Sequence, residues 1–166
     1  MSTTTVTGER ADFLQMLAKN RGFLRFTVQN LTDEQANQRT TVSELTLGGL
    51  IKHVAVAERQ WANFILEGAS GMKMDEVDWM AQFSMREEET LAELLAKYEE
   101  IARRTDELVA TVDLDESHPL PQAPWFEPGA AWSNRLVLMH IIAETSQHAG
   151  HADIIRESLD GQKTMG

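Results

Sequence analysis

Apolar residues recur every three or four positions through four long stretches of this sequence, which is the spacing of one face of an α-helix. The stretch from 47 to 67 shows the pattern most fully. Its inward stripe contains Leu50, His53, Val54, Ala57, Trp61, Phe64 and Ile65. No strand pattern and no internal repeat competes with the helical one. The sequence therefore predicts an all-α fold.

The ends of the predicted helices carry signals of their own. We expect helices over about residues 8–29, 47–67, 84–109 and 132–159. Thr46 is the expected N-cap of the second helix, and Gly68 ends it. Ser84 and Glu87 match a capping box, which predicts the start of the third helix. Four helices of this length in 166 residues predict a single-domain four-helix bundle over residues 1–166.

Composition limits the partners and the chemistry. The net charge of −11 argues against nucleic acid or an anionic membrane as a partner. No apolar run approaches the roughly 20 residues that a membrane span needs. The chain has no cysteine, so a transition-metal site must use His, Asp and Glu, and thiol chemistry needs an external thiol. The N-terminus lacks the features of a signal peptide, so we expect a cytoplasmic location.

Glu144 and His148 stand four residues apart in the last predicted helix, so their side chains lie one above the other on one face. His53 falls within the apolar stripe of the second helix. A carboxylate in an apolar face needs a partner, and one divalent ion held by His53, Glu144 and His148 would provide it. The competing interpretation is a buried Glu–His hydrogen-bonded pair, or a helix face that borders a solvent-filled groove.

Spacing alone leaves other pairings open. His140 with Glu144, or His148 with His151, could each chelate an ion from the same helix. One mononuclear site cannot use all four residues, because they span more than about 10 Å along the helix. A second metal, or hydrogen bonding from His140 or His151 to the ligands, is a further alternative.

A connection that carries all four prolines joins the third and fourth predicted helices over about residues 111–131. A loop this long usually covers something, so we expect it over the end of the bundle near the metal site, with Trp125 and Phe126. His118 in this loop is expected to be solvated. Trp61 and Trp132 are expected in the core, and the methionines from Met72 to Met85 are expected to fill irregular space.

Two segments resemble a known family. They are Leu47-Gly-Gly-Leu-Ile-Lys-His53 and Glu144-Thr-Ser-Gln-His148-Ala-Gly-His151-Ala-Asp-Ile-Ile-Arg156. Over nearly the whole chain the sequence is similar to the DinB/YfiT-like four-helix metalloproteins, and most similar to the branch of mycothiol-dependent maleylpyruvate isomerases and thiol S-transferases. The resemblance implies His53, Glu144 and His148 as the metal ligands. It also implies zinc, with nickel in some relatives, and a homodimer.

The resemblance further implies a metal-dependent enzyme that activates a low-molecular-weight thiol such as mycothiol. The isomerases carry a further C-terminal domain that this chain does not show, so S-transfer to an electrophilic small molecule is the expected form. A metal-dependent hydrolase and a non-catalytic metal- or ligand-binding bundle are the alternatives. Three protein ligands leave a coordination position open, which is typical of catalytic metal sites.

Overall fold

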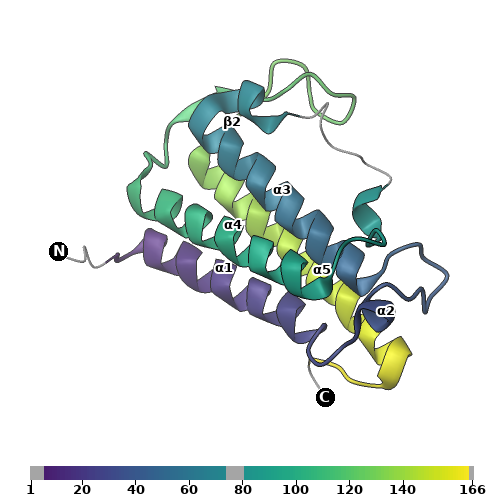
Figure 1. Ribbon diagram of the computed structural model, residues 1–166. Coiled ribbons are helices and arrows are strands. Elements are labelled where there is room, and N and C mark those ends of the chain that lie inside the picture. Colours follow the sequence, from purple (N-terminus) through teal and green to yellow (C-terminus); the bar gives the residue numbers. More distant parts are fainter. Residues whose placement is uncertain (1–5, 74–80, 165–166) are drawn as a thin grey trace.

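Four long helices form the bundle in the computed structural model, which describes residues 6–73 and 81–164. They are α1 (Glu9–Phe26), α3 (Leu47–Glu67), α4 (Leu91–Thr111) and α5 (Asn134–Asp160). Each packs against two others, in the order α1, α5, α3, α4 and back to α1 (Figure 1). The predicted all-α four-helix bundle is therefore confirmed. None of the helices in the described part of the chain is long and apolar enough to cross a membrane.

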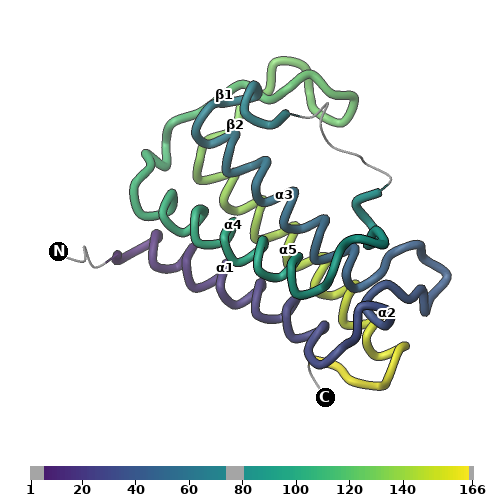
Figure 2. The backbone as a smooth tube through the Cα atoms, viewed as in Figure 1, coloured from purple at the N-terminus to yellow at the C-terminus, as the bar shows by residue number. Residues whose placement is uncertain are grey.

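The connections add short elements between the long helices. They are α2 (Asp33–Ala36), η1 (Gly68–Met72), η3 (Ala81–Phe83), β1 (Ser117–Pro119) and β2 (Ala131–Ser133). The helices α3 and α4 run in the same direction along the bundle (Figure 2). The strands β1 and β2 pair antiparallel, with His118 opposite Trp132. The sequence did not predict these strands, because three residues are too few for an alternating pattern to emerge.

The start of the third long helix was predicted wrongly. The capping box forms at Thr90 and Glu93, so α4 begins at Leu91 rather than near Ser84. The residues before Thr90 make tertiary contacts instead. The Asn37 side chain hydrogen-bonds both the backbone N–H and the backbone carbonyl of Met85. These contacts hold the segment in an irregular conformation, with a turn at Glu87 and Glu88, and they outweigh its local helical signal.

The ends of α3 match the prediction. The Thr46 hydroxyl accepts a hydrogen bond from the backbone N–H of Gly49, as an N-cap does. Gly68 ends the helix with a φ of 65°, a conformation that glycine adopts without steric cost. The sequence therefore defines this helix at both ends.

Glycines in the first turn of α3 let the 83–85 segment pack directly on the helix. A Cβ on Gly49 would lie 1.9 Å from the carbonyl oxygen of Phe83, and one on Gly48 would lie 2.1 Å from Sδ of Met85. A larger residue at position 49 would force the backbone of the segment to move, and one at position 48 would displace the Met85 side chain. This close approach brings η3 against the N-terminal half of α3.

The core consists of two apolar clusters, one toward each end of the bundle. The first gathers residues such as Leu50 and Tyr98, and the second residues such as Phe64 and Ile141. Polar side chains lie between them. Arg21 on α1 binds the Glu58 carboxylate on α3 through two hydrogen bonds of 2.5 and 3.2 Å, and both side chains are buried.

Candidate metal centre

His53 on α3 meets Glu144 and His148 on α5 at the interface of the two helices. One ligand atom from each residue lies within 4.8 Å of the other two. Nε2 of His53 lies 3.1 Å from Oε1 of Glu144, and Nε2 of His148 lies 3.3 Å from the same oxygen. The spacing of four residues on α5 stacks Glu144 and His148, and the packing of α3 on α5 adds His53.

The groups around the two imidazoles determine which ring nitrogen faces inward. Oε1 of the buried Gln82 lies 2.9 Å from Nδ1 of His53. With Nδ1–H donating to this oxygen, Nε2 of His53 presents a lone pair to Glu144. Nδ1 of His148 lies 3.3 Å from Nδ1 of His151. A proton on Nδ1 of His148 leaves its Nε2 with a lone pair directed toward Glu144.

Three acceptor atoms then converge: two imidazole nitrogens and one carboxylate oxygen. Such atoms repel one another unless a cation or a shared proton lies between them. With no ion present, the facing nitrogens of His148 and His53 can carry protons and donate hydrogen bonds to Glu144, which hold the pKa of its carboxyl well below its usual value. The carboxylate is therefore ionised whether protons or an ion lie between the three residues. This donor set, with two nitrogens and one oxygen, suits a borderline divalent ion such as zinc.

His140 lies apart from these three residues. Its ring packs on Trp61 and Trp132, with centroids 4.8 and 5.1 Å away. Burial lowers the pKa of this imidazole, although Glu144 opposes the shift. No hydrogen bond joins His140 to the trio within the described residues. It belongs to the wall of an adjoining cavity, whereas His151 contacts the trio directly.

A cavity of about 250 Å³ opens beside the trio, between α3 and α5. It is bordered by His53, Val56, Ala57, Gln60, Trp61, Met72, Gln82, Trp125, Phe126, His140 and Glu144. Trp125 and Phe126 come from the Pro-rich connection, so this loop lies near the candidate site as its length predicts. Met72 borders the cavity too, which goes beyond the space-filling role that we expected for it.

The matching family model covers residues 12–161 and describes mycothiol S-transferases. The chain belongs to the mycothiol S-transferase family. Its fold is also similar to the crystal structure of a conserved protein from Enterococcus faecalis, at 13% identity and a TM-score of 0.72. That match covers 95% of this chain and 100% of the other, and it supports the fold alone. No protein with curated annotation matches the chain.

His118 is not the solvated loop residue that we expected. It sits in β1, half-buried, with Nε2 3.2 Å from the carbonyl oxygen of Ile65. Its ring packs edge-on against Phe64 at 5.7 Å. His118 therefore fastens the β1–β2 pair to the C-terminal end of α3. Sequence reasoning missed this role because the contact joins residues 53 positions apart.

Gln82 and Gln60 are site residues that the sequence reasoning overlooked. Gln82 lies in an irregular segment that carries no periodic signal. Gln60 did carry one, because it follows His53 by two helical turns and so shares its face. An isolated glutamine on a helix face is common, so it does not by itself indicate a functional site.

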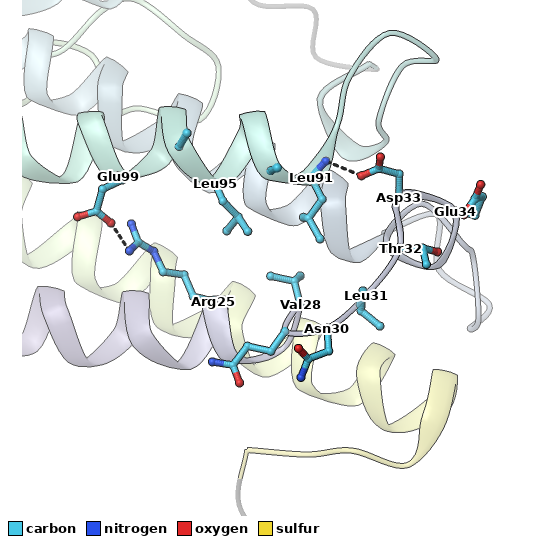
Figure 3. A pocket seen from close by; sticks show the side chains of 13 residues that line it. Arg25, Val28, Asn30, Leu31, Thr32, Asp33, Glu34, Leu91, Leu95 and Glu99 are labelled. Atoms are coloured by element: carbon cyan, nitrogen blue, oxygen red, sulfur yellow. Dashed lines mark hydrogen bonds and ion pairs between the residues drawn. The ribbon is translucent and has the colours of Figure 1, made fainter.

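A larger hollow of about 800 Å³ lies elsewhere, between the end of α1 and the start of α4 (Figure 3). Leu31, Leu91 and Leu95 border it, together with the ion pair between Arg25 and Glu99. The Asp33 carboxylate accepts a hydrogen bond from the backbone N–H of Leu91 beside it. This hollow contains no histidine, so the smaller cavity beside the trio is the better candidate for chemistry.

Proposed function

We propose that this protein is a metal-dependent enzyme that transfers a low-molecular-weight thiol, such as mycothiol, to an electrophilic small molecule. The observation that carries the proposal is the convergence of His53, Glu144 and His148 beside an apolar cavity. Membership of the mycothiol S-transferase family supports the same chemistry. The chain has no cysteine of its own, which fits a thiol supplied as a cosubstrate.

We assign His53, Glu144 and His148 as ligands of a single divalent ion, with zinc as the ion that the donor set fits best. Three protein ligands leave room for a further ligand from the substrate side. When bound, such an ion would lower the pKa of a coordinating thiol and so favour its thiolate.

The residues around the ligands have positioning roles. Gln82 holds the His53 ring through Nδ1, and His151 contacts the His148 ring at its Nδ1. Such contacts keep the ligand rings oriented and their inward nitrogens free of protons. The apolar walls at Val56, Ala57 and Trp61 exclude water, which strengthens electrostatic interactions within the cavity.

The test is a conjugation assay with zinc-loaded protein. Mycothiol, bacillithiol, glutathione and cysteine are each supplied with a model electrophile, and adduct formation is followed by mass spectrometry. We expect conjugation with mycothiol or a close analogue, lost on chelation and restored by zinc. Helical circular dichroism should survive chelation, because the apolar clusters build the core. Absence of metal-dependent conjugation with all four thiols would instead favour a hydrolase or a non-catalytic binding protein.

A further inference from the structure

The cavity beside the trio has an aromatic wall at one end. Trp61 stacks on Trp132 with centroids 5.0 Å apart and an angle of 16°. Phe126 meets the Trp61 ring edge-on at 6.3 Å. An apolar cavity of about 150 Å³ is enough to hold benzene. At about 250 Å³, this cavity accommodates one aromatic ring with a short side chain.

Gln60 contributes a buried amide to the wall of this cavity. It is only 6% exposed and makes no hydrogen bond with the described residues. Its amide atoms are not sealed off from solvent. Since Gln60 borders the cavity, its amide is open to a molecule bound there. A buried amide is costly unless something hydrogen-bonds it.

The charges around the cavity restrict what can bind. Among the described residues, no Lys or Arg borders it, whereas the acidic residue Glu144 does. The charge of a divalent ion at the trio would be balanced by the Glu144 carboxylate and one bound thiolate, so an anionic group on the electrophile would be desolvated without a counter-charge. A sugar- or peptide-like thiol would leave its own polar groups unpaired against these walls. A halide or other anion released by substitution would find no Lys or Arg on the described part of the cavity wall.

We propose that this cavity binds the electrophile, and that the electrophile is an uncharged aryl-substituted α,β-unsaturated carbonyl compound. Its ring packs against Trp61 and Phe126, and its carbonyl oxygen accepts a hydrogen bond from the Gln60 amide. Its β-carbon faces the trio, where the thiol enters. This inference rests on the proposed function and specifies the substrate class of the same site.

The reaction in this arrangement is a conjugate addition. The sulfur lone pair forms a bond to the β-carbon, and the π electrons of the C=C bond move to give an enolate. Its negative charge develops on the carbonyl oxygen beside the Gln60 N–H, which stabilises it. The proton that the thiol lost ends on the α-carbon. The product contains every atom of both reactants, so no leaving group has to be accommodated.

Binding can be measured without reaction, from the tryptophan fluorescence of the zinc-loaded protein with excess mycothiol to fill the open coordination position. The probes are 4-phenylbutan-2-one, which is the unreactive saturated form of the enone, 3-phenylpropanoate, which is anionic, and propylbenzene, which lacks the carbonyl. We expect the ketone to bind at least about tenfold more tightly than the carboxylate. Equal binding of the carboxylate would overturn the proposal.

Gln60→Leu and Gln60→Met remove the amide and keep much of its volume, and either suffices if the other fails to fold. We expect both to weaken ketone binding by about three- to tenfold and to leave propylbenzene binding unchanged. The matched control is Gln15→Leu on the exposed face of α1, which should change neither ketone binding nor propylbenzene binding. Undiminished ketone binding in both Gln60 variants would contradict the assignment.

A conjugation assay with 4-phenylbut-3-en-2-one and mycothiol distinguishes the proposed S-transferase function from the assignment of the cavity to the electrophile. Ketone binding that depends on Gln60, without conjugation of any thiol, would overturn the proposed function and support the cavity assignment. Conjugation that proceeds equally well in the Gln60 variants would support the function and overturn the cavity assignment. Tryptophan quenching by mycothiol alone that depends on Gln60 would also overturn it, because the cavity would then hold the thiol.

Discussion

The side-chain Oε1 of Gln82 lies 2.9 Å from Nδ1 of His53, a contact that joins the short helix η3 to α3. It sets the His53 tautomer and turns Nε2 toward Glu144. Gln82→Leu should keep the packing but release the ring, so we expect metal affinity to fall about 10- to 100-fold. Titration with zinc against a competing chelator measures this. An unchanged affinity would mean that Gln82 has no role in orienting the ligand.

Replacing the proposed ligands should remove the metal. We expect His53→Ala and His148→Ala to lose the bound ion, and Glu144→Gln to bind it much more weakly, because a neutral amide replaces the carboxylate. Elemental analysis of the purified proteins gives the metal content per chain. His118→Ala, far from the trio in β1, should retain the metal. Full metal content in both histidine variants would refute the assignment.

Gly49→Ala should disturb the site from a distance. Its Cβ would lie 1.9 Å from the carbonyl oxygen of Phe83, so the segment that carries Gln82 must move. We expect lower stability and weaker metal binding together, measured by urea denaturation and zinc titration. Gly22→Ala in α1 is the control, because nothing lies within 4 Å of its Cβ. It should stabilise the protein by up to about 1 kcal/mol and leave zinc affinity unchanged.

The buried ion pair between Arg21 and Glu58 should matter far more than an exposed one. Glu58→Ala leaves the Arg21 guanidinium buried, with Asp106 as its remaining partner, whose side chain is 43% exposed. We expect the free energy of unfolding to fall by about 3–5 kcal/mol. Glu107→Ala breaks the exposed pair with Arg103 and should cost under about 1 kcal/mol. Equal losses in urea denaturation would contradict this ranking.

We also expect the protein to form a homodimer. Leu136 and Met139 lie one turn apart on α5 and are 40% and 52% exposed, so they form an apolar patch that self-association would cover. Sedimentation at micromolar concentration should detect a dimer in the unaltered protein and a monomer in Met139→Glu. A monomer in the unaltered protein would remove the basis for this prediction.

Local signals predicted the helices well where they agreed with the packing. The Thr46 cap and the glycine at 68 define α3 at both ends. The signal at Ser84 failed because tertiary contacts with Asn37 and with the glycines of α3 hold this segment in an irregular, non-helical conformation. A capping box is a preference of about 1 kcal/mol, and several tertiary contacts together exceed it.

The sequence by itself determined the four apolar stripes, and with them the bundle, because helical periodicity is a local property that one chain segment carries alone. It also placed Glu144 and His148 on one face of α5. Only the tertiary structure decided that His53 meets them, that His140 turns instead to Trp61 and Trp132, and that Gln82 supports the His53 ring. Those relationships depend on how α3, α5 and η3 pack, and spacing along a single helix does not encode the rotation of one helix against another.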